Sequence, residues 1–575
     1  MSEDAAPAGR RLFRISELKA PEATAFLAPA LVAWRRVMMG LIVVGVAHTL
    51  LGLHLRGLTE FFFYRQDLPV AGLMLLLAVG LYFVRPAWAP AWTLAPTWRT
   101  AALIALAVTA FAWAGTYLVY DNYALSTDEF MARFDAQILA TGRLAAPVPP
   151  QWREYVHALQ PQFMLDVPGH AYWVSAYLPV NAAFLALASK LGAESLMPPV
   201  WAGISVLATF GVGRRLWPQQ PKAALTAALL LATAPQLLIT AMTPYAMSAH
   251  LALNMVWLWL VLRGGKLGHG AAALVAFLAT GLHQLVFHPL FAAPFVLELW
   301  LAKRWRPAVW HTAAFATIGL FWVLYPSLLL HALGATPTST TAAGHGFLLE
   351  ALALIQAFDP SALGMMAKNL VRFVTWQSLL TVPLAVAAAI PAIRAGGTLR
   401  AIVLGIALTA TAMLVLLPYQ GHGWGYRYLH GLMGSGCLLA SWYLTRAARP
   451  PAVRSARSAF AFACAVSVFV LLPIRAAMTY AFEHPYAVAE RRIKAMDAKV
   501  VLVDDAATAF GTDLVRNDPF LRRGPIVLGM GALRPNQWRN LCAQFRLSTF
   551  SGDAMAAAGL NSRERHAADT CTRAP

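Results

Sequence analysis

The chain has 575 residues, of which 59% are hydrophobic and 12% are charged. Average globular proteins are about 45–50% apolar and about 25% charged, so this composition excludes a soluble enzyme, a disordered protein and a coiled coil. The 45 Lys and Arg exceed the 26 Asp and Glu by 19. In a chain this apolar, we expect the excess in cytoplasmic loops that orient membrane helices, and no nucleic-acid partner.

The first 35 residues contain no short apolar core followed by a small-residue cleavage site, so they do not form a cleaved signal peptide. We expect residues 1–35 to be a cytoplasmic segment before an uncleaved first span. A span needs about 20 apolar residues. Thirteen ranges fit: 36–55, 69–85, 99–120, 196–216, 222–242, 246–263, 268–284, 286–302, 308–332, 378–394, 400–418, 428–446 and 458–480.

The stretch 171–191 is also apolar, but Pro168, Pro179 and Asn181 interrupt it, and we expect a helix lying on the membrane surface. If this stretch crossed the membrane instead, the orientation of every later span would be inverted. The distribution of Lys and Arg between the two sides of the membrane tests the predicted number of spans. With the N-terminus inside, sixteen Lys and Arg fall in short cytoplasmic connections, whereas the short outer loops at 56–68 and 419–427 carry only Arg56, Arg65 and Arg427. This asymmetry places the C-terminus outside.

Three large segments are then external: 121–195, 333–377 and the tail 481–575. KVVLVDD and GPIVLGMGAL in the tail predict two buried strands, so we expect a small α/β domain there. Cys542 and Cys571 would lie in an oxidising compartment, where a disulfide and two free thiols are both open alternatives. No CxxC motif or Cys/His cluster indicates a zinc site.

The first outer segment begins with STDEFMARFDAQILATGRL. Ser126 or Thr127 can cap a helix whose apolar residues follow helical spacing. Asp128 and Glu129 then stand where the chain leaves the membrane. They could be a solvated helix start, with Glu129 pairing to Arg133 four residues on. The long loop that follows, rich in aromatic residues and prolines, favours instead a segment that shapes a site.

This pattern resembles the GT-C superfamily. The resemblance is carried by the Asp-Glu pair after an outward span, then DAQILATGRLAAPVPP, PGHAYW and GRRLW, over roughly residues 115–300 and 415–445. More narrowly, the sequence looks like the branch that contains protein O-mannosyltransferases and lipid A aminoarabinose transferases. The resemblance implies an all-α polytopic fold in residues 36–480, with 121–195 as the catalytic outer loop and a periplasmic C-terminal domain. It also implies the bacterial cytoplasmic membrane as the location.

What the resemblance implies chemically is transfer of a sugar from a polyprenyl-phosphate donor to a glycan, lipid or protein acceptor. Asp128 matches the family's catalytic acid position, where a carboxylate would act as general base and the reaction would invert the anomeric carbon. Glu129, its neighbour, would orient it or bind a metal. The sequence itself requires no cofactor, and a divalent cation stays open.

The leaving phosphate needs a cation near the interface. Arg427 in PYQGHGWGYRYLHG can hold phosphate with two hydrogen bonds, and Arg427-Tyr428 matches an Arg-Tyr pair of the resembled branch. An interfacial anchor is the alternative. His422 and Tyr426 could line the same pocket.

Further candidates for the substrate pocket are Asp166, His250, His283 and His288. Asp166 could contact sugar hydroxyls or cap a turn. The histidines could bind a metal, but neutral histidines in a wet cavity are favoured. TPYAMSAH, at 243–250, lacks the second carboxylate often found there in the resembled branch.

Two other functions compete with glycosyl transfer. A transporter or flippase of lipid-linked sugars should show two similar halves with broken helices, which the sequence lacks. An O-antigen ligase or polymerase would carry its key Arg and His residues in a large late outer loop. The loop at 333–377 has only Lys368 and Arg372.

Overall fold

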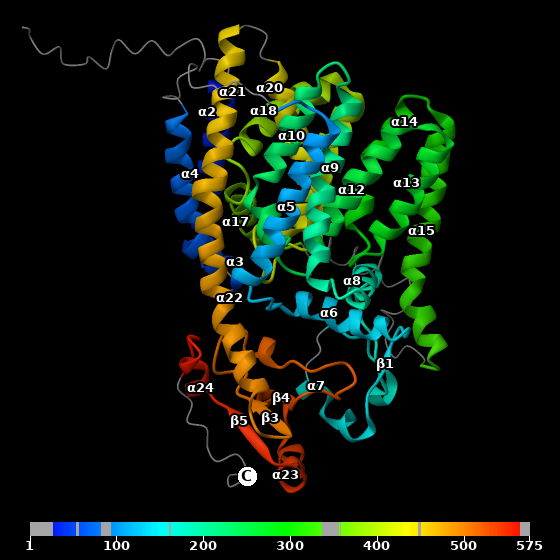
Figure 1. Ribbon diagram of the computed structural model, residues 1–575, viewed down its shortest axis with the longest axis vertical. Coiled ribbons are helices and arrows are strands. Elements are labelled where there is room, and N and C mark those ends of the chain that lie inside the picture. The colour runs from blue at the N-terminus through cyan, green and yellow to red at the C-terminus, as the bar shows by residue number, and fades with distance from the viewer. Residues whose placement is uncertain are drawn as a thin grey trace, which may run out of the picture.

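A computed structural model describes residues 27–52, 57–81, 94–159, 163–335, 356, 358–446 and 450–563. Figure 1 shows a helical bundle above a small domain with a sheet, and one helix, α22 (Leu472–Lys494), that runs from the bundle into this domain. The predicted helical fold with a small C-terminal α/β unit is therefore observed. Most of the predicted cytoplasmic segment 1–35 lies outside the described residues.

Seven helical stretches in the described residues are long and apolar enough to cross a membrane. They are α2 (Ala28–Leu50), α3–η2–α4 (Leu58–Gly80), α5 (Trp98–Leu118), η6–α9 (Glu194–Leu216), α15 (Trp305–Ala332), α19 (Gly397–Leu416) and α21–η9–α22 (Val453–Lys494). Shorter helices fill the bundle: α10 (Pro221–Ala232), α11 (Pro235–Thr240), α12 (Met247–Arg263), α13 (Gly265–Thr280), α14 (Phe287–Leu301), α17 (Ser361–Thr375), α18 (Thr381–Ala395) and α20 (Met433–Thr445).

Each of the thirteen predicted ranges overlaps one of these helices, but the number of spans stays a prediction. Two boundaries differ from the prediction. The expected loop at 56–68 is helical from Leu58 onward, and its Asp67 is buried against Arg475 rather than exposed in a turn. The last helix continues past residue 480 because Tyr486, Ala489 and Ile493 bury against the C-terminal sheet.

The expected outer loop at 333–377 also contains a helix. α17 packs against α2, and both cations that the sequence places in this loop, Lys368 and Arg372, are buried. The remainder of that predicted loop, residues 336–355 and 357, lies outside the described residues.

Two short helices lie across the end of the bundle (Figure 1). α6 (Thr127–Ala140) starts at Ser126, whose side chain caps it, and α8 (Val180–Lys190) packs against α6. With 11 residues, α8 is too short to span a membrane, in agreement with the predicted surface helix. Between them lie β1 (Ala146–Pro147), η4 (Pro150–Tyr155), α7 (Val156–Leu159), η5 (Pro168–His170) and β2 (Tyr172–Trp173).

The C-terminal domain contains a three-stranded parallel sheet in the order β4-β3-β5. Its elements are β3 (Val500–Val503), η10 (Gly511–Leu514), β4 (Ile526–Gly529), η11 (Met530–Ala532), α23 (Pro535–Gln544), β5 (Leu547–Phe550) and α24 (Gly552–Ala557). Both predicted strands are present, and β5 was not predicted. Alternate residues of β3 face opposite ways: Val500 and Leu502 pack with Met131 of α6, whereas Val501 and Val503 pack with α22. The sheet therefore supports α6 directly.

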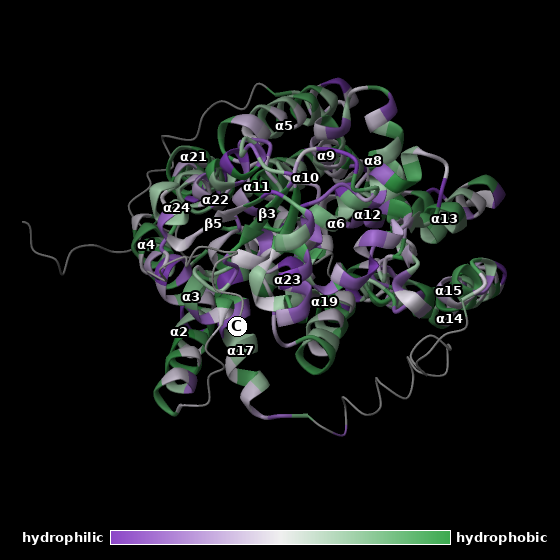
Figure 2. Ribbon diagram, turned by 90° about the horizontal axis from the view of Figure 1, so that it is seen from below, coloured by the Kyte–Doolittle hydropathy of each residue, from purple (hydrophilic) through white to green (hydrophobic). Residues whose placement is uncertain are grey.

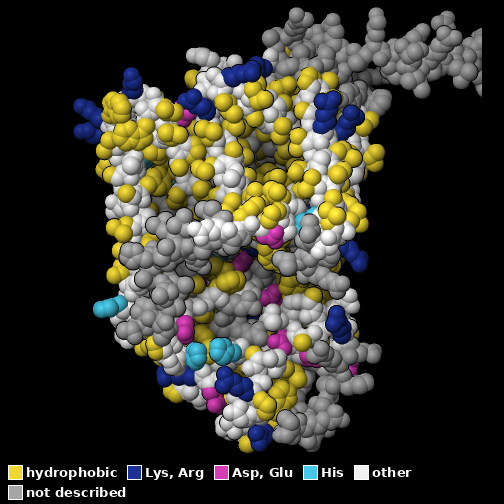
Figure 3. All heavy atoms as spheres, turned by 180° about the vertical axis from the view of Figure 1, so that it is seen from behind, with side chains coloured by type: hydrophobic (Ala, Val, Ile, Leu, Met, Phe, Trp, Pro, Cys, Tyr) yellow, Lys and Arg dark blue, Asp and Glu magenta, His cyan; other side chains and the backbone are white. Residues whose placement is uncertain are grey.

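The surface of the bundle has the pattern of a membrane protein. Figure 2 shows hydrophobic residues around the periphery of the helices. Figure 3 shows a belt of hydrophobic side chains with Lys and Arg along its end away from the C-terminal domain, and charged side chains of both signs on that domain. In the C-terminal domain Cys542 is disulfide-bonded, so it is not a free thiol, and Cys571, with which a disulfide was one open alternative, lies outside the described residues. Cys437 and Cys464 are free thiols.

Candidate active site

The predicted base and the predicted phosphate ligand are in direct contact. Asp128 lies in the first turn of α6, and Arg427 is the first residue of η8 (Arg427–Leu432). Nη1 of Arg427 donates a 2.6 Å hydrogen bond to Oδ2 of Asp128. The other carboxylate oxygen, Oδ1, accepts a hydrogen bond from the hydroxyl of Tyr177. Each carboxylate oxygen of Asp128 thus has its own donor.

These neighbours fix the ionisation of Asp128. Burial would raise the pKa of Asp128, but the charge of Arg427, the nearby His283 and the Tyr177 hydroxyl together hold this pKa below its ordinary value. The ring of His283 lies 4.1 Å from that of Tyr177, measured between centroids. Asp128 is therefore a carboxylate, able to accept a proton, at neutral pH.

Glu129 points into the protein and is fully buried. Its Oε2 accepts a 2.7 Å hydrogen bond from the N–H of Ser126, while the Ser126 hydroxyl accepts one of 3.4 Å from the N–H of Glu129. This reciprocal capping box fixes the start of α6. The hydroxyl of Thr243 donates to Oε1, and burial raises the pKa of Glu129. The alternative pairing with Arg133 is wrong, because Arg133 bonds instead to Asn122 and Glu194.

Tyr245 joins the start of α6 to the loop that carries Arg427. Its hydroxyl lies 2.7 Å from Oγ of Ser126 and donates to the carbonyl of His422 at 3.2 Å. The guanidinium of Arg427 lies 4.8 Å from the centre of the Tyr245 ring, within cation–π range. His422 is buried, with Nε2 3.7 Å from Oε1 of Glu483. His422 is thus part of the support around Arg427.

The two predicted tyrosines flank Arg427 differently. Tyr428 lies with its ring centre 6.0 Å from the Arg427 guanidinium and stacks on Phe287 at 5.8 Å. Tyr426 is buried, and its carbonyl accepts a 3.0 Å hydrogen bond from the side chain of Gln236. Tyr428 therefore borders the site, whereas the backbone of Tyr426 anchors its loop.

Arg372 was not among the predicted site residues. Its Nη2 donates a 2.6 Å hydrogen bond to the carbonyl of Gly423, and its Nε lies 3.7 Å from Asp67. Asp67 also pairs with Arg475 at 3.4 Å. α17 thereby holds the loop that positions Arg427. The spacing of Lys368 and Arg372, four residues apart in an otherwise uncharged stretch, indicated one helix face, but nothing in the sequence linked that face to residues 418–427. Tyr177 and Tyr245 carried no distinguishing signal.

Of the four other predicted pocket residues, two lie at the site and two lie away from it. His283 lies beside Asp128 and Tyr177, and His250 lines a small cavity with Arg427 and Tyr428. His288 bonds to Asn254 at 2.7 Å through Nδ1 and packs against Trp257, so it serves the helix packing. Asp166 lies on an exposed loop. No three His, Cys, Asp or Glu side chains in the described ranges cluster closely enough to hold a metal ion.

Small cavities surround the ion pair. One of about 20 Å³ is lined by Asp128, Asp135, Tyr177 and His283, and a second of about 20 Å³ shares Asp135 and Tyr177 with it. A third, of about 10 Å³, borders Arg427. Each has room for about one water molecule.

The described fold has counterparts among solved structures. ArnT from Cupriavidus metallidurans bound to undecaprenyl phosphate matches 80% of this chain and 94% of its own, at 12% identity and a TM-score of 0.52. The apo state of the same protein covers 74% and 85%, at 13% identity and a TM-score of 0.48. The Archaeoglobus fulgidus oligosaccharyltransferase in complex with Zn and sulfate covers 73% and 62%, at 10% identity and a TM-score of 0.39.

No protein-family model matches the sequence. No curated protein matches it either. At these low identities, the likeness to ArnT shows a common fold, in agreement with the resemblance seen in the sequence.

Proposed function

We propose that this protein is a membrane glycosyltransferase that uses a polyprenyl-phosphate-linked sugar as donor. The observation that carries the proposal is the contact between Asp128 and Arg427 at the end of a GT-C fold. An ionised carboxylate beside a cation at a membrane interface provides the two groups that the transfer needs. The ArnT structure of the same fold holds undecaprenyl phosphate, which supports this class of donor.

The chemistry follows from the two side chains. Asp128 takes the proton of an acceptor hydroxyl as its oxygen attacks the anomeric carbon. The bond from that carbon to the phosphate oxygen breaks, and the negative charge that develops on the phosphate is stabilised by Arg427. Attack opposite the leaving phosphate inverts the anomeric carbon.

The ion pair between Arg427 and Asp128 implies that the donor binds before Asp128 acts on the acceptor. While Arg427 bonds to Asp128, the carboxylate is shared with the guanidinium. A donor phosphate competes for the same guanidinium donors, and its binding releases Asp128 toward the acceptor. Glu129, fixed in the capping box, keeps the first turn of α6 in place during this exchange.

The orientation of the chain is part of the proposal. The site lies at the end of the bundle that carries the C-terminal domain, where Figure 3 shows charges of both signs, whereas Lys and Arg predominate at the other end. Basic residues favour the cytoplasmic side. The site would then face the periplasm from the cytoplasmic membrane, with a glycan, lipid or protein as acceptor.

The test is transfer of a radiolabelled sugar from polyprenyl phosphate by the purified full chain. We expect Asp128→Asn to lower kcat by about 10²–10⁴, the usual contribution of a general base. Asp553→Asn, an exposed carboxylate of α24, is the matched control and should transfer as the wild type does. Undiminished transfer by Asp128→Asn would remove the proposed base. Donor flipping in liposomes without transfer would favour a transporter.

A further inference from the structure

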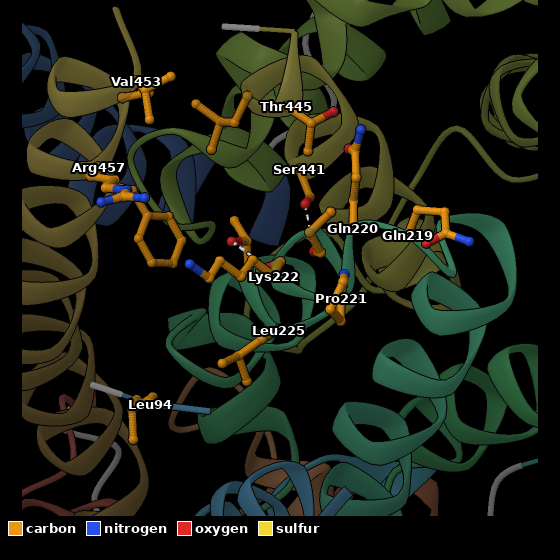
Figure 4. A pocket seen from close by; sticks show the side chains of 15 residues that line it. Leu94, Gln219, Gln220, Pro221, Lys222, Leu225, Ser441, Thr445, Val453 and Arg457 are labelled. Carbon is orange, nitrogen blue, oxygen red and sulfur yellow. Dashed lines mark hydrogen bonds between the residues drawn. The ribbon is translucent and has the colours of Figure 1, made fainter. Parts of the chain in front are cut away.

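A cavity of about 470 Å³ lies at the end of the bundle away from Asp128, between α10, α20 and α21 (Figure 4). Ligand pockets in proteins are about 300–1,000 Å³, so this space can hold part of a small molecule. It has no contact with the proposed active site. A ligand bound in this cavity would therefore be separate from the substrates of the proposed active site.

Two cations define one side of the cavity. Figure 4 shows the side chain of Lys222 on α10 extending toward α21, the helix that carries Arg457, and both side chains line the cavity. Both side chains are exposed, and neither forms an ion pair within the described parts of the chain. Among the described residues that line the cavity there is no Asp or Glu. Two like charges that face each other repel, and an anion between them would remove this repulsion.

The rest of the wall is suited to lipid. Leu225, Leu444 and Phe460 line the same cavity, and each belongs to a helix of the apolar bundle. A free inorganic anion would leave this apolar wall without a partner. A phospholipid would cover it with the upper part of its acyl chains. Basic pockets between membrane helices on the cytoplasmic side are known to bind anionic lipid head groups.

We propose that this cavity binds an anionic phospholipid, with the head-group phosphate between Lys222 and Arg457 and the acyl chains against Leu225 and Phe460. The site is separate from the donor site in both position and partner. It ties the helix ends at 221–225 and 453–460 to the anionic surface of the membrane.

The experiment is native mass spectrometry of the full chain titrated with phosphatidylglycerol or with phosphatidylcholine. We expect tighter binding of phosphatidylglycerol to the wild type. Each basic residue near an anionic membrane surface contributes a factor of about five, so Lys222→Gln with Arg457→Gln should weaken phosphatidylglycerol binding about 30-fold. Phosphatidylcholine binding should not change. The matched control is Arg263→Gln with Lys266→Gln, two exposed cations in the α12–α13 connection that do not line the cavity.

Several results would overturn the proposal. The double variant could bind phosphatidylglycerol as the wild type does, or the control variant could lose as much, which would mean diffuse attraction to the whole basic end. Displacement of the lipid by millimolar inorganic phosphate would assign the cations to a free anion. Melting temperatures of all variants, and the two single substitutions, separate loss of the lipid from loss of the fold.

Discussion

At the scale of single residues, Tyr177 affects the pKa of the proposed base, Asp128. Its hydroxyl is one of two donors to the Asp128 carboxylate and helps to lower the pKa of Asp128. Tyr177→Phe removes this donor, so the pKa of Asp128 should rise toward its ordinary value. Because the base acts only when ionised, the acid limb of the kcat/KM profile should move to higher pH by about one unit, with little change above neutral pH.

Tyr172→Phe is the matched control, since Tyr172 lies on the same loop and makes no bond to Asp128 among the described contacts. Its pH profile should overlay that of the wild type. A Tyr177→Phe profile that falls equally at all pH values would indicate a packing role for Tyr177 instead.

Asp135 permits a prediction about stability. It lies seven residues after Asp128 on the same face of α6, and burial raises its pKa to about 7, partly offset by a hydrogen bond from Ser175. Its pKa in the folded state exceeds that in the unfolded chain, so between about pH 4 and pH 7 the folded state binds more protons, and stability decreases as pH rises.

Asp135→Asn should therefore stabilise the protein at pH 8, on the order of 2 kcal/mol, and have little effect at pH 4. Thermal melting of both proteins at the two pH values measures this. Asp553→Asn, an exposed carboxylate of α24, is measured beside it as the matched control. An equal effect of Asp135→Asn at both pH values would contradict a shifted pKa.

At the scale of elements, the backbone of the loop at 418–427 positions the guanidinium of Arg427. Gly423 has a φ of +142°, and a Cβ there would lie 2.3 Å from Cδ of Arg427. Gly423→Ala must shift Arg427 or the loop, at about 1–3 kcal/mol. We expect at least a tenfold loss of kcat/KM, mainly through a higher KM for the donor, in the transfer assay.

Gly421→Ala is the control for the same loop. A Cβ at Gly421 would meet only the end of the Arg427 side chain, at 3.9 Å, which is ordinary contact. Its kinetics should stay close to those of the wild type. Equal losses in both variants would mean that the loop tolerates no added atoms anywhere, and that the placement of Arg427 is not the cause.

Local signals in the sequence predicted the elements better than their contacts. Each of the thirteen predicted hydrophobic runs overlaps a helix of the bundle. The sequence offered Ser126 or Thr127 as the cap of α6, and Ser126 caps it through a capping box with Glu129. The pairing of Asp128 with Arg427 was not predicted, since 299 residues separate them, although the resemblance gave each a role in the same reaction. Asp67, Arg372 and Arg475 were not predicted as a group, because buried charges from three distant helices have no shared spacing.

At the scale of the whole molecule, the C-terminal domain acts on the site through α6. The α6 face that bears Met131 and Phe134 packs on the sheet, and Oγ1 of Thr127 donates to Asp513 at 2.7 Å. Nη2 of Arg516 donates to the carbonyl of Leu125 at 2.5 Å. The residues on either side of the helix cap are therefore held by a domain whose strands the sequence predicted but whose contacts with α6 it did not.

Arg516 is the place to test this coupling. Its guanidinium also lies 4.1 Å from the ring centre of Tyr123 and 5.2 Å from that of Phe130, so one side chain contacts the chain before and after the cap. Arg516→Ala removes a charged hydrogen bond worth about 1.5–3 kcal/mol and leaves the Leu125 carbonyl without this donor. Amides at 125–131 should then exchange hydrogen faster by about one order of magnitude or more, and kcat should fall because Asp128 is less well fixed. Arg523→Ala, exposed on the same domain, should change neither. If exchange at 125–131 stays slow in Arg516→Ala while kcat falls, Arg516 acts on the reaction by its charge, and the domain is not the support of α6 that its contacts imply.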